Sequence, residues 1–597
     1  MGRHKRNHRR VGQNAPYASP RAAAVTVLIL VLLLVGWLAV RAVQARSALL
    51  QAKAGLTTAV EGVRGGDLGS NALGELSRAR SAASDDVGRA RAAVDDPVWR
   101  LAAAVPLLGR SFAVTRDATL VVERVVDGVL PPLLDGARTL QEGQLFGDGR
   151  VDLALLEVLS GQVDEADSAA VAAEADARRI SARSLPGPLQ ELRADLVGQV
   201  ERLAAGTTSA RSVTDIAPAM LGAGGPRRYF LAVQNNAEVR GTGGLIGAYA
   251  VLGVDGGALS LERTGTNLDL KNAPAPVADL GPEFNERYDG QAARSSWTSA
   301  VRTPDWPSAA TIMAGLWARQ GGGKLDGVIG VDPLAMAQVL AVTGPAQVNG
   351  RTIGAGNVVD FVMRDEYAEF PGADIERKEV LEGLASGLYT SVAAGAYEAP
   401  AMLNALRAAA GGGHLQIWSA RPEEQAVIAP FRASGSILPG PGAYLQVVSV
   451  NIAGNKADYY VRREVSYART APGEATASVS LTNTVVASAV PPIVTGRLDE
   501  TRGPRGPLEP GQTRQAVSIY AGEGQVVRRM LVDGVEVPAD LGTERGHGVG
   551  TVEVELRTSR PTVVTAEMTD PGGLLTYRQQ PLVVDDTLQM SVPFVVG

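Results

Sequence analysis

The chain has 597 residues and a formal net charge of −6. Its length is too great for one compact core, so we expect several domains. Beyond the N-terminal tail the basic residues are interspersed with acids, so there is no extended basic surface for nucleic acid and we expect no nucleic-acid partner. Cysteine is absent, which excludes disulfides, thiolate nucleophiles and cysteine-ligated metals.

Residues 22–40 form an apolar run in which only Thr26 is clearly polar. A helix of this length, at about 1.5 Å per residue, covers the hydrocarbon core of a bilayer. Residues 1–21 are basic and contain no acid, which retains this tail in the cytoplasm under the positive-inside rule. We therefore predict a single-pass cell-membrane protein with a cytoplasmic tail at 1–21, a transmembrane helix at 22–40 and an extracytoplasmic C-terminal side.

A cleaved signal peptide is the alternative, because residues 42–45 loosely resemble a cleavage site. The apolar run is longer than a usual signal core, and Arg41 directly after it is typical of an anchor. The sequence therefore favours the anchor.

Residues 43–217 are rich in Ala, Leu and Arg and have helical periodicity. Apolar residues alternate at three and four positions, which predicts a bundle or antiparallel helix pair. The clearest stripes are Leu73, Leu76, Ala83, Val87, Ala90 and Val94, then Leu156, Leu159, Val163, Ala166, Ala170 and Ala173. We expect an all-α stalk or spacer, with a partner-binding surface as the alternative.

Strands and helices alternate in residues 226–440, which predicts a layered α/β (α+β) core domain. The expected strands are 229–234, 245–254, 258–263 and 327–331, and the expected helices are 308–320, 333–342 and 375–394. In residues 443–597 short strands alternate apolar and polar side chains between turn clusters, so we expect one or two all-β sandwich modules.

Histidine chemistry is not expected. Of four histidines, His4 and His8 lie in the tail, while His414 and His547 are isolated in sequence from other candidate ligands. Neither a zinc site nor a Ser-His arrangement is therefore predicted.

The first polar cluster follows the strand expected to end at residue 234: Asn235, Asn236, Glu238 and Arg240, then glycines in residues 241–244. The simpler interpretation is a tight turn with solvated polar residues. The alternative is a phosphate site, although the glycine spacing is not that of a P-loop or dinucleotide fingerprint.

The second cluster is residues 364–366 followed by Asp374, Arg377 and Lys378 at the start of the last helix of the core. A solvated, capped helix N-terminus explains it most simply. Two cations in a first turn oppose the helix dipole, which favours an anionic partner.

The stretch 227–348, with its runs at 234–244 and 325–332, resembles a bacterial envelope family built on a domain of unknown function (DUF4012-like). That resemblance implies an envelope location without an activity.

A more distant resemblance is to the LytR-CpsA-Psr family, which attaches lipid-linked glycopolymers to the cell wall. It implies a core fold of that kind, with Arg263, Arg364 and Arg377 contacting pyrophosphate, Asp374 as a nearby acid and a divalent cation such as magnesium. Arg240 of the first cluster completes the candidate ligand-binding set. The family's Pro-Arg-Asp run is absent, because residues 261–264 read Leu-Glu-Arg-Thr.

Together these observations favour a membrane-anchored extracytoplasmic envelope protein that acts as a non-catalytic scaffold or cell-wall-associated accessory. The alternative is binding or transfer of polyprenyl-pyrophosphate-linked glycopolymers.

Overall fold

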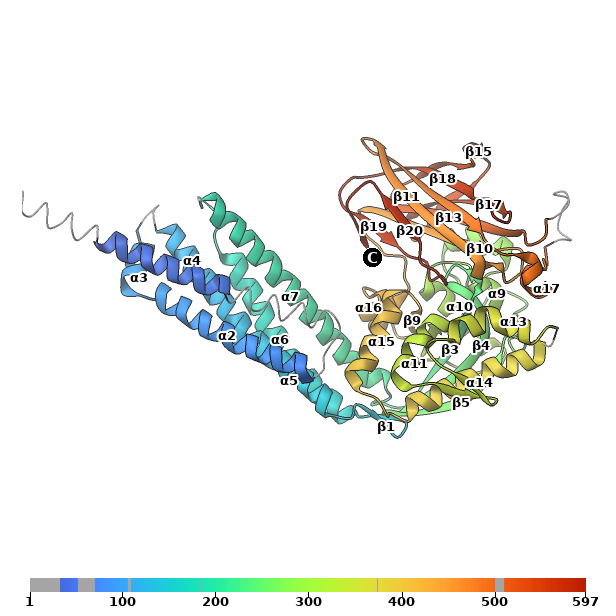
Figure 1. Cartoon of the computed structure of the whole chain (residues 1–597), viewed down its shortest axis with the longest axis horizontal. Helices are drawn as coiled ribbons and strands as arrows, with labels where there is room; N and C mark the ends of the chain where they lie inside the picture. The colour runs from blue at the N-terminus through green and yellow to red at the C-terminus, as the bar shows by residue number, and fades with distance from the viewer. Residues whose placement is uncertain (1–32, 52–69, 106–108, 184, 373, 500–508) are drawn as a thin grey trace, which may run out of the picture. The chain divides into compact units, whose positions relative to one another are not determined.

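The computed structural model describes residues 33–51, 70–105, 109–183, 185–372, 374–499 and 509–597. It is multidomain, with helices first, a mixed α/β middle and β-rich sheets at the end (Figure 1). The chain divides into two compact units. The first comprises the described residues up to 137 together with 162–209, and the second comprises 138–161 and 210–597. The predicted boundaries at 217–226 and 440–443 stay predictions.

The first unit is helical, as its apolar stripes predict. In α2, the buried side chains include Ala83, Val87, Ala90 and Val94, each at most 1% exposed. The bounds are an N-terminal helix Leu33–Gln51, α2 Ser70–Val94, α3 Pro97–Ala103, α4 Arg110–Arg124, η1 Val125–Val129, α5 Leu130–Glu142, α6 Leu153–Arg179 and α7 Gly187–Met220, the last three extending into the second unit.

The Leu33–Gln51 helix is long and apolar enough to cross a membrane. An anchor and a signal sequence both satisfy this criterion. The predicted tail at 1–21 and residues 22–32 of the predicted span lie outside the described residues.

Seven of the described strands form the sheet of the middle region, in the order β1-β2-β5-β4-β3-β6-β9. Its bounds are β1 Phe146–Gly147, β2 Arg150–Val151, β3 Arg227–Arg240, β4 Gly243–Asp255, β5 Ala258–Thr266, β6 Gly327–Val331 and β9 Leu415–Ser419. β3, β4 and β5 are an antiparallel meander, and β6 lies parallel to β3. The β1–β2 hairpin and β9 were not anticipated from the sequence.

Helices cover both faces of this sheet. Phe230, Tyr249 and Trp317 belong to the core under one face, and Val233 and Val380 to the core under the other. The first face carries α8 Pro282–Tyr288, α9 Trp297–Ala300 and α10 Trp306–Arg319, and the second carries α11 Pro333–Thr343 and α14 Asp374–Ala393. Other bounds are β7 Ala346–Val348, β8 Arg351–Ile353, α12 Val358–Asp360, η3 Phe361–Asp365, α13 Glu366–Glu369, α15 Ala399–Gly411 and α16 Pro422–Ile428.

The C-terminal region contains two sheets, each with six of the described strands, in the orders β16-β17-β13-β10-β19-β21 and β15-β14-β18-β12-β11-β20. Their facing side chains share one apolar core that includes Leu445, Ile519, Val479 and Val564. Strand β12 shows the period-two pattern expected from sequence, with Ala477, Val479 and Leu481 buried.

The bounds in this region are β10 Ala443–Asn451, η5 Ala457–Tyr460, β11 Val461–Ala471, β12 Glu474–Asn483, α17 Pro492–Thr495, β13 Thr513–Glu523, β14 Val527–Val532, β15 Val535–Val537, β16 Asp540–Glu544, β17 His547–Leu556, β18 Thr562–Thr569, β19 Leu575–Arg578, β20 Thr587–Met590 and β21 Phe594–Val596.

Candidate functional site

The first polar cluster lies within a strand and is buried. β3 continues to Arg240 through register shifts after Val233 and after Asn235, instead of ending at residue 234. Asn236 is 0% exposed, Glu238 5% and Arg240 8%. The interpretation as a turn with solvated polar residues is therefore wrong, because distant parts of the chain cover these side chains.

The covering groups come from the C-terminal region. The Val239 backbone N–H donates to Asp458 Oδ2 at 2.8 Å, and the Arg240 carbonyl accepts a 2.8 Å hydrogen bond from Gln580 Nε2. We call the following set the β3 junction: Glu238, Val239 and Arg240 of β3 with Asn451, Lys456, Asp458 and Gln580.

The charges of the β3 junction are matched internally. Glu238 forms ion pairs with both Arg240 and Lys456, and the Arg240 guanidinium also donates to the Asn451 carbonyl. Although burial opposes ionisation, Lys456 and Arg240 hold the pKa of Glu238 below its usual value. The carboxylate is therefore charged, and the chain's own cations neutralise it.

Asp458 receives three hydrogen bonds at the centre of the junction. In addition to the Val239 N–H, Asn451 Nδ2 donates at 2.7 Å and Gln515 Nε2 at 2.6 Å. Burial raises the pKa of Asp458 to about 6, and these three donors offset only part of that effect. Asp458 therefore titrates well above the usual range of an aspartate.

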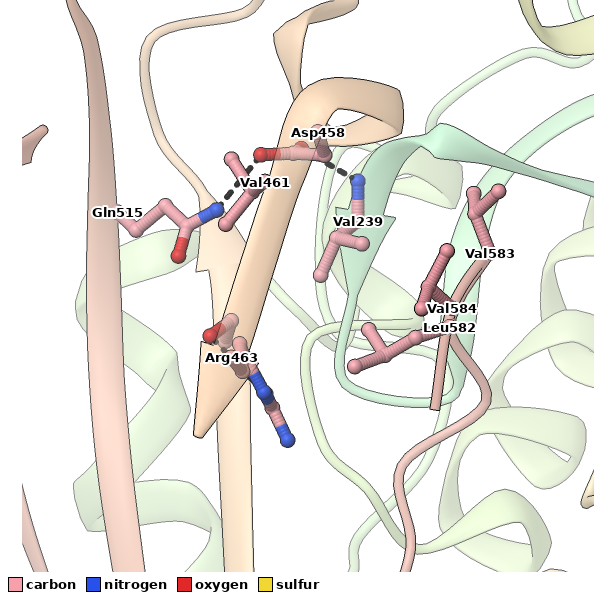
Figure 2. Close-up of a pocket in the computed structure, with 9 residues that line it drawn as sticks. Val239, Asp458, Val461, Arg463, Gln515, Leu582, Val583 and Val584 are labelled. Atoms are coloured by element: carbon pink, nitrogen blue, oxygen red, sulfur yellow. Dashed lines mark hydrogen bonds between the residues drawn. The ribbon is translucent and has the colours of Figure 1, made fainter. Parts of the chain in front are cut away.

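A small cavity lies beside this carboxyl. Figure 2 shows Val239 and Asp458 on its wall with Arg463 below, and Leu582, Val583 and Val584 opposite. Its volume of about 20 Å³ has room for one water and no larger ligand.

Two glycines of the run 241–244 allow close backbone contacts. A Cβ on Gly241 would lie 2.1 Å from the Arg302 carbonyl oxygen, and one on Gly244 would lie 2.3 Å from the Asn235 carbonyl carbon. A side chain at either position would clash with backbone. Packing within the fold thus accounts for these glycines without a bound anion.

The second polar cluster is also partly buried. Arg377 Nη1 on α14 lies 3.2 Å from Glu366 Oε1, and its guanidinium stands 5.1 Å from the centre of the Tyr367 ring. The Tyr367 hydroxyl accepts a 2.8 Å hydrogen bond from Asn235 Nδ2. This contact joins the two polar clusters, which were expected to be separate. We expected a solvated helix N-terminus here, but this is wrong for Arg377, because its side chain is only 9% exposed.

Glu366 is the most perturbed carboxyl of this second cluster. Burial raises its pKa to about 7, and the neighbouring Arg377 guanidinium only partly opposes this rise. Its side chain is 0% exposed. Glu366 therefore changes charge close to neutral pH.

Arg364 is half-buried and already paired. Its guanidinium lies 3.1 Å from Asp360 Oδ2 and 2.6 Å from Asp365 Oδ1, and Nη1 donates to the Tyr459 hydroxyl at 3.1 Å. The side chain of Asp374 lies outside the described residues.

Arg263 lies on the opposite side of the sheet from Arg377. It is exposed on β5 beside Val251 of β4, with its guanidinium 5.6 Å from the Trp317 ring of α10. Thr264, the next residue, instead hydrogen-bonds Glu382 of α14. Because successive strand residues face opposite sides, the sheet separates Arg263 from Arg377. Pyrophosphate binding by these arginines stays a prediction, and the structure does not gather them in one site.

A family model described as "Protein of unknown function (DUF4012)" matches residues 224–367. The match begins just before β3 and ends at Tyr367, so it contains the β3 part of the junction and its contact with Tyr367. No curated protein and no solved structure matches the chain. The comparisons give no support for the resemblance to the LytR-CpsA-Psr family.

Within the DUF4012 region, Asp332 is the partner of His414, a histidine expected to be isolated. His414 Nδ1 lies 2.6 Å from Asp332 Oδ2, which also accepts from Asn236 Nδ2 at 3.0 Å. Burial by itself would lower the pKa of His414, but the charge and hydrogen bond of Asp332 outweigh it and raise the pKa above its usual value.

Asp332 also begins α11, because its Oδ1 accepts from the backbone N–H groups of Leu334 and Ala335 at 3.0 and 3.1 Å. Asp followed by Pro333 at the end of an expected strand is a helix-start signal readable from sequence. The partnership with His414 has no such local signal.

The remaining described histidine is structural. The ring nitrogens of His547 lie 2.9 Å from the carbonyl oxygens of Ala521 and Leu438. Within the described ranges, no group of three or more His, Asp and Glu side chains is arranged to hold a metal ion. Magnesium remains an expectation from the distant resemblance only.

Proposed function

We propose that this protein is a single-pass, membrane-anchored scaffold of the cell envelope whose DUF4012 region and C-terminal sheets form one non-catalytic extracytoplasmic body. The apolar run at 22–40, whose described part begins the Leu33–Gln51 helix, and the basic residues at 1–21 support the anchored topology. The anchor ends near Val40, so both sheet-containing regions lie outside the cell.

The observation that carries the scaffold role is the internal neutralisation of the β3 junction. A catalytic or binding site presents polar groups to a cavity that a ligand can enter. Here Glu238 and Arg240 form an ion pair with each other. Each also bonds to a group more than 200 positions away in the chain: Glu238 to Lys456, and Arg240 to the Asn451 carbonyl. Their effect is to join the DUF4012 region to the C-terminal sheets.

The contact between the DUF4012 region and the C-terminal sheets extends beyond the β3 junction. Glu544 of β16 accepts hydrogen bonds from the hydroxyls of Tyr288 at 2.7 Å, Tyr520 at 2.6 Å and Thr303 at 2.6 Å. Tyr288 and Thr303 belong to the DUF4012 region, so a second buried carboxyl connects it to the C-terminal sheets. Polar groups buried with their partners orient two regions specifically, which suits a scaffold.

A paired substitution tests the scaffold role in the full-length protein. Arg240→Ala leaves Glu238 buried with one cation fewer, and we expect it to lower the unfolding free energy by about 3 kcal/mol or more. Arg263→Ala is the matched control, because Arg263 is exposed on β5, which β4 separates from β3 in the same sheet, and we expect a change of about 0.5 kcal/mol or less.

Ligand binding by the full-length wild type and by three arginine variants tests the alternative function. Titration with farnesyl diphosphate and Mg²⁺ should give no saturable binding to the wild type. Saturable binding that Arg263→Ala, Arg364→Ala and Arg377→Ala each abolish, with the fold intact, would reject the scaffold in favour of a polyprenyl-pyrophosphate site.

Thiol labelling tests the topology cleanly because the chain has no cysteine. With a membrane-impermeant maleimide on intact cells, Leu574→Cys should label and Asn7→Cys should label only after permeabilisation. Labelling of Asn7→Cys in intact cells, or a mature product beginning near residue 46, would overturn the anchored topology.

A further inference from the structure

The N-terminal helix is attached to the bundle at one carboxylate. Trp37 Nε1 donates to Asp96 Oδ1 at 3.3 Å, and Arg41 Nη2 donates to Asp96 Oδ2 at 3.3 Å. Asp96 also caps α3, because its Oδ1 accepts from the Val98 N–H at 2.9 Å. The start of α3 therefore lies level with Trp37 and Arg41.

Packing of this helix against the bundle begins just past Trp37. Leu38, Ala42 and Ala45 face a small core with Val94 and Trp99. Leu33, Leu34, Val35 and Trp37 are between 45% and 64% exposed. The bundle thus covers one face of the helix from Leu38 onward and leaves the preceding turn uncovered.

These contacts locate the bilayer surface if the helix is the anchor that we propose. Asp96 and Arg41 are too costly to place in hydrocarbon, whereas an indole such as Trp37 favours the interface. The membrane surface then lies at Trp37–Arg41, and α3 lies against it. Figure 1 shows α3 beside the first turns of the Leu33–Gln51 helix, at that end of the bundle.

The outer side of α3 is apolar. Trp99 points inward, is 2% exposed and donates to the Phe112 carbonyl at 3.0 Å. Leu101 is 72% exposed and Val105 45%. Leu101 is two positions after Trp99, so it lies on the opposite side of α3 from the bundle, and Val105 is exposed two residues after α3 ends at Ala103.

Cations flank these side chains, and the neighbouring acids are paired. Arg100 and Arg110 are both exposed; in the chain Arg100 directly precedes Leu101, and Arg110 follows Val105 at the start of α4. Asp95 pairs with Arg91 at 2.5 Å and with Arg116 at 3.0 Å. Exposed apolar side chains between guanidinium groups match the boundary between acyl chains and lipid phosphates.

We propose that this α3 corner, Arg100, Leu101, Val105 and Arg110, inserts into the headgroup layer of the outer leaflet. The inference rests on the proposed membrane anchor. Two apolar side chains bind a bilayer weakly, but the anchor keeps the corner at the surface and gives it a high effective concentration. Together the anchor and the corner make two attachments, which limit tilting of the bundle.

Single-cysteine variants of the full-length protein in lipid vesicles test this contact. Leu34→Cys reports on the anchor and Leu101→Cys on the corner. Leu50→Cys is the control, because Leu50 is 50% exposed and lies about 20 Å further along the same helix than Trp37. Each carries an environment-sensitive fluorophore, with iodide as the aqueous quencher and spin-labelled phospholipids as membrane quenchers.

We expect deep acyl labels to quench the Leu34 probe, labels near the headgroup to quench the Leu101 probe, and iodide alone to quench the Leu50 probe. If the Leu34 probe responds to lipid quenchers while the Leu101 probe responds only to iodide, the corner contact is wrong and the anchor stands. If the Leu34 probe responds only to iodide, the anchor itself is wrong and the corner contact falls with it.

Discussion

His414 and Asp332 are hydrogen-bonded at 2.6 Å although 82 positions separate them in the chain. Because Asp332 also accepts from Asn236 and caps α11, one carboxylate connects β3, the start of α11 and the residue before β9. Protonation of His414 strengthens this connection by adding a positive charge next to the Asp332 carboxylate.

We predict that His414→Gln changes the pH dependence of stability. The folded protein favours the protonated imidazole, since its pKa is raised above the usual 6.5. The stabilisation is therefore complete below about pH 6.5 and is lost as the pH rises through the folded-state pKa. Thermal unfolding should show a larger difference between wild type and His414→Gln at pH 6 than at pH 8.5. Parallel curves would contradict the predicted role of His414.

Asp458→Ala should destabilise the second unit strongly. It removes three hydrogen bonds and leaves the donors of Val239, Asn451 and Gln515 buried without their acceptor. Each buried donor left unsatisfied costs about 1–3 kcal/mol, so we expect a loss of about 3–5 kcal/mol in urea unfolding. Asp540→Ala is the control, because that carboxyl is 66% exposed. Equal effects of the two substitutions would argue against the junction.

Glu366→Gln should remove a loss of stability that the wild type undergoes as the pH rises towards 7. The pKa of Glu366 is raised from 4.5 to about 7, so the stability linked to its neutral form is complete below pH 4.5 and is lost as the pH rises to about 7. Glutamine does not ionise, and the wild type should lose on the order of 3 kcal/mol relative to it over that range. Chemical unfolding at pH 5 and pH 8 measures the shift. Glu369→Gln, an exposed neighbour, should show none.

Gly241→Ala should disrupt the β3–β4 turn. Its Cβ would lie 2.1 Å from the Arg302 carbonyl oxygen, and relief requires backbone movement that costs about 3 kcal/mol or more. Gly247→Ala in β4 meets no atom within 4 Å and should change stability by less than about 1 kcal/mol. Soluble yield and melting temperature of the two variants give the comparison. A folded Gly241→Ala protein of wild-type stability would contradict the predicted clash.

The elements with strong local patterns were predictable. The expected strand at 327–331 and helix at 333–342 match β6 Gly327–Val331 and α11 Pro333–Thr343 to within a residue. Five of the six residues in the apolar stripe ending at Val94 are buried as expected, and the sixth, Leu76, is half-buried. Side-chain periodicity records which face of an element will be covered, and the Asp332–Pro333 start signal acts within one helical turn.

The state of the polar residues was decided only by tertiary structure. Val239 meets Asp458 across 219 positions, and Asn235 meets Tyr367 across 132. No local pattern distinguishes a polar residue that will face water from one that a distant segment will cover and neutralise. Chain composition and periodicity thus determined the apolar helix, the helical bundle and the positions of strands with a strong local pattern, such as β6. The C-terminal sheets fold onto the DUF4012 region, and this packing decided that Glu238 and Arg240 belong to the β3 junction. Burial of such charged groups is favourable only where their partner groups are buried with them.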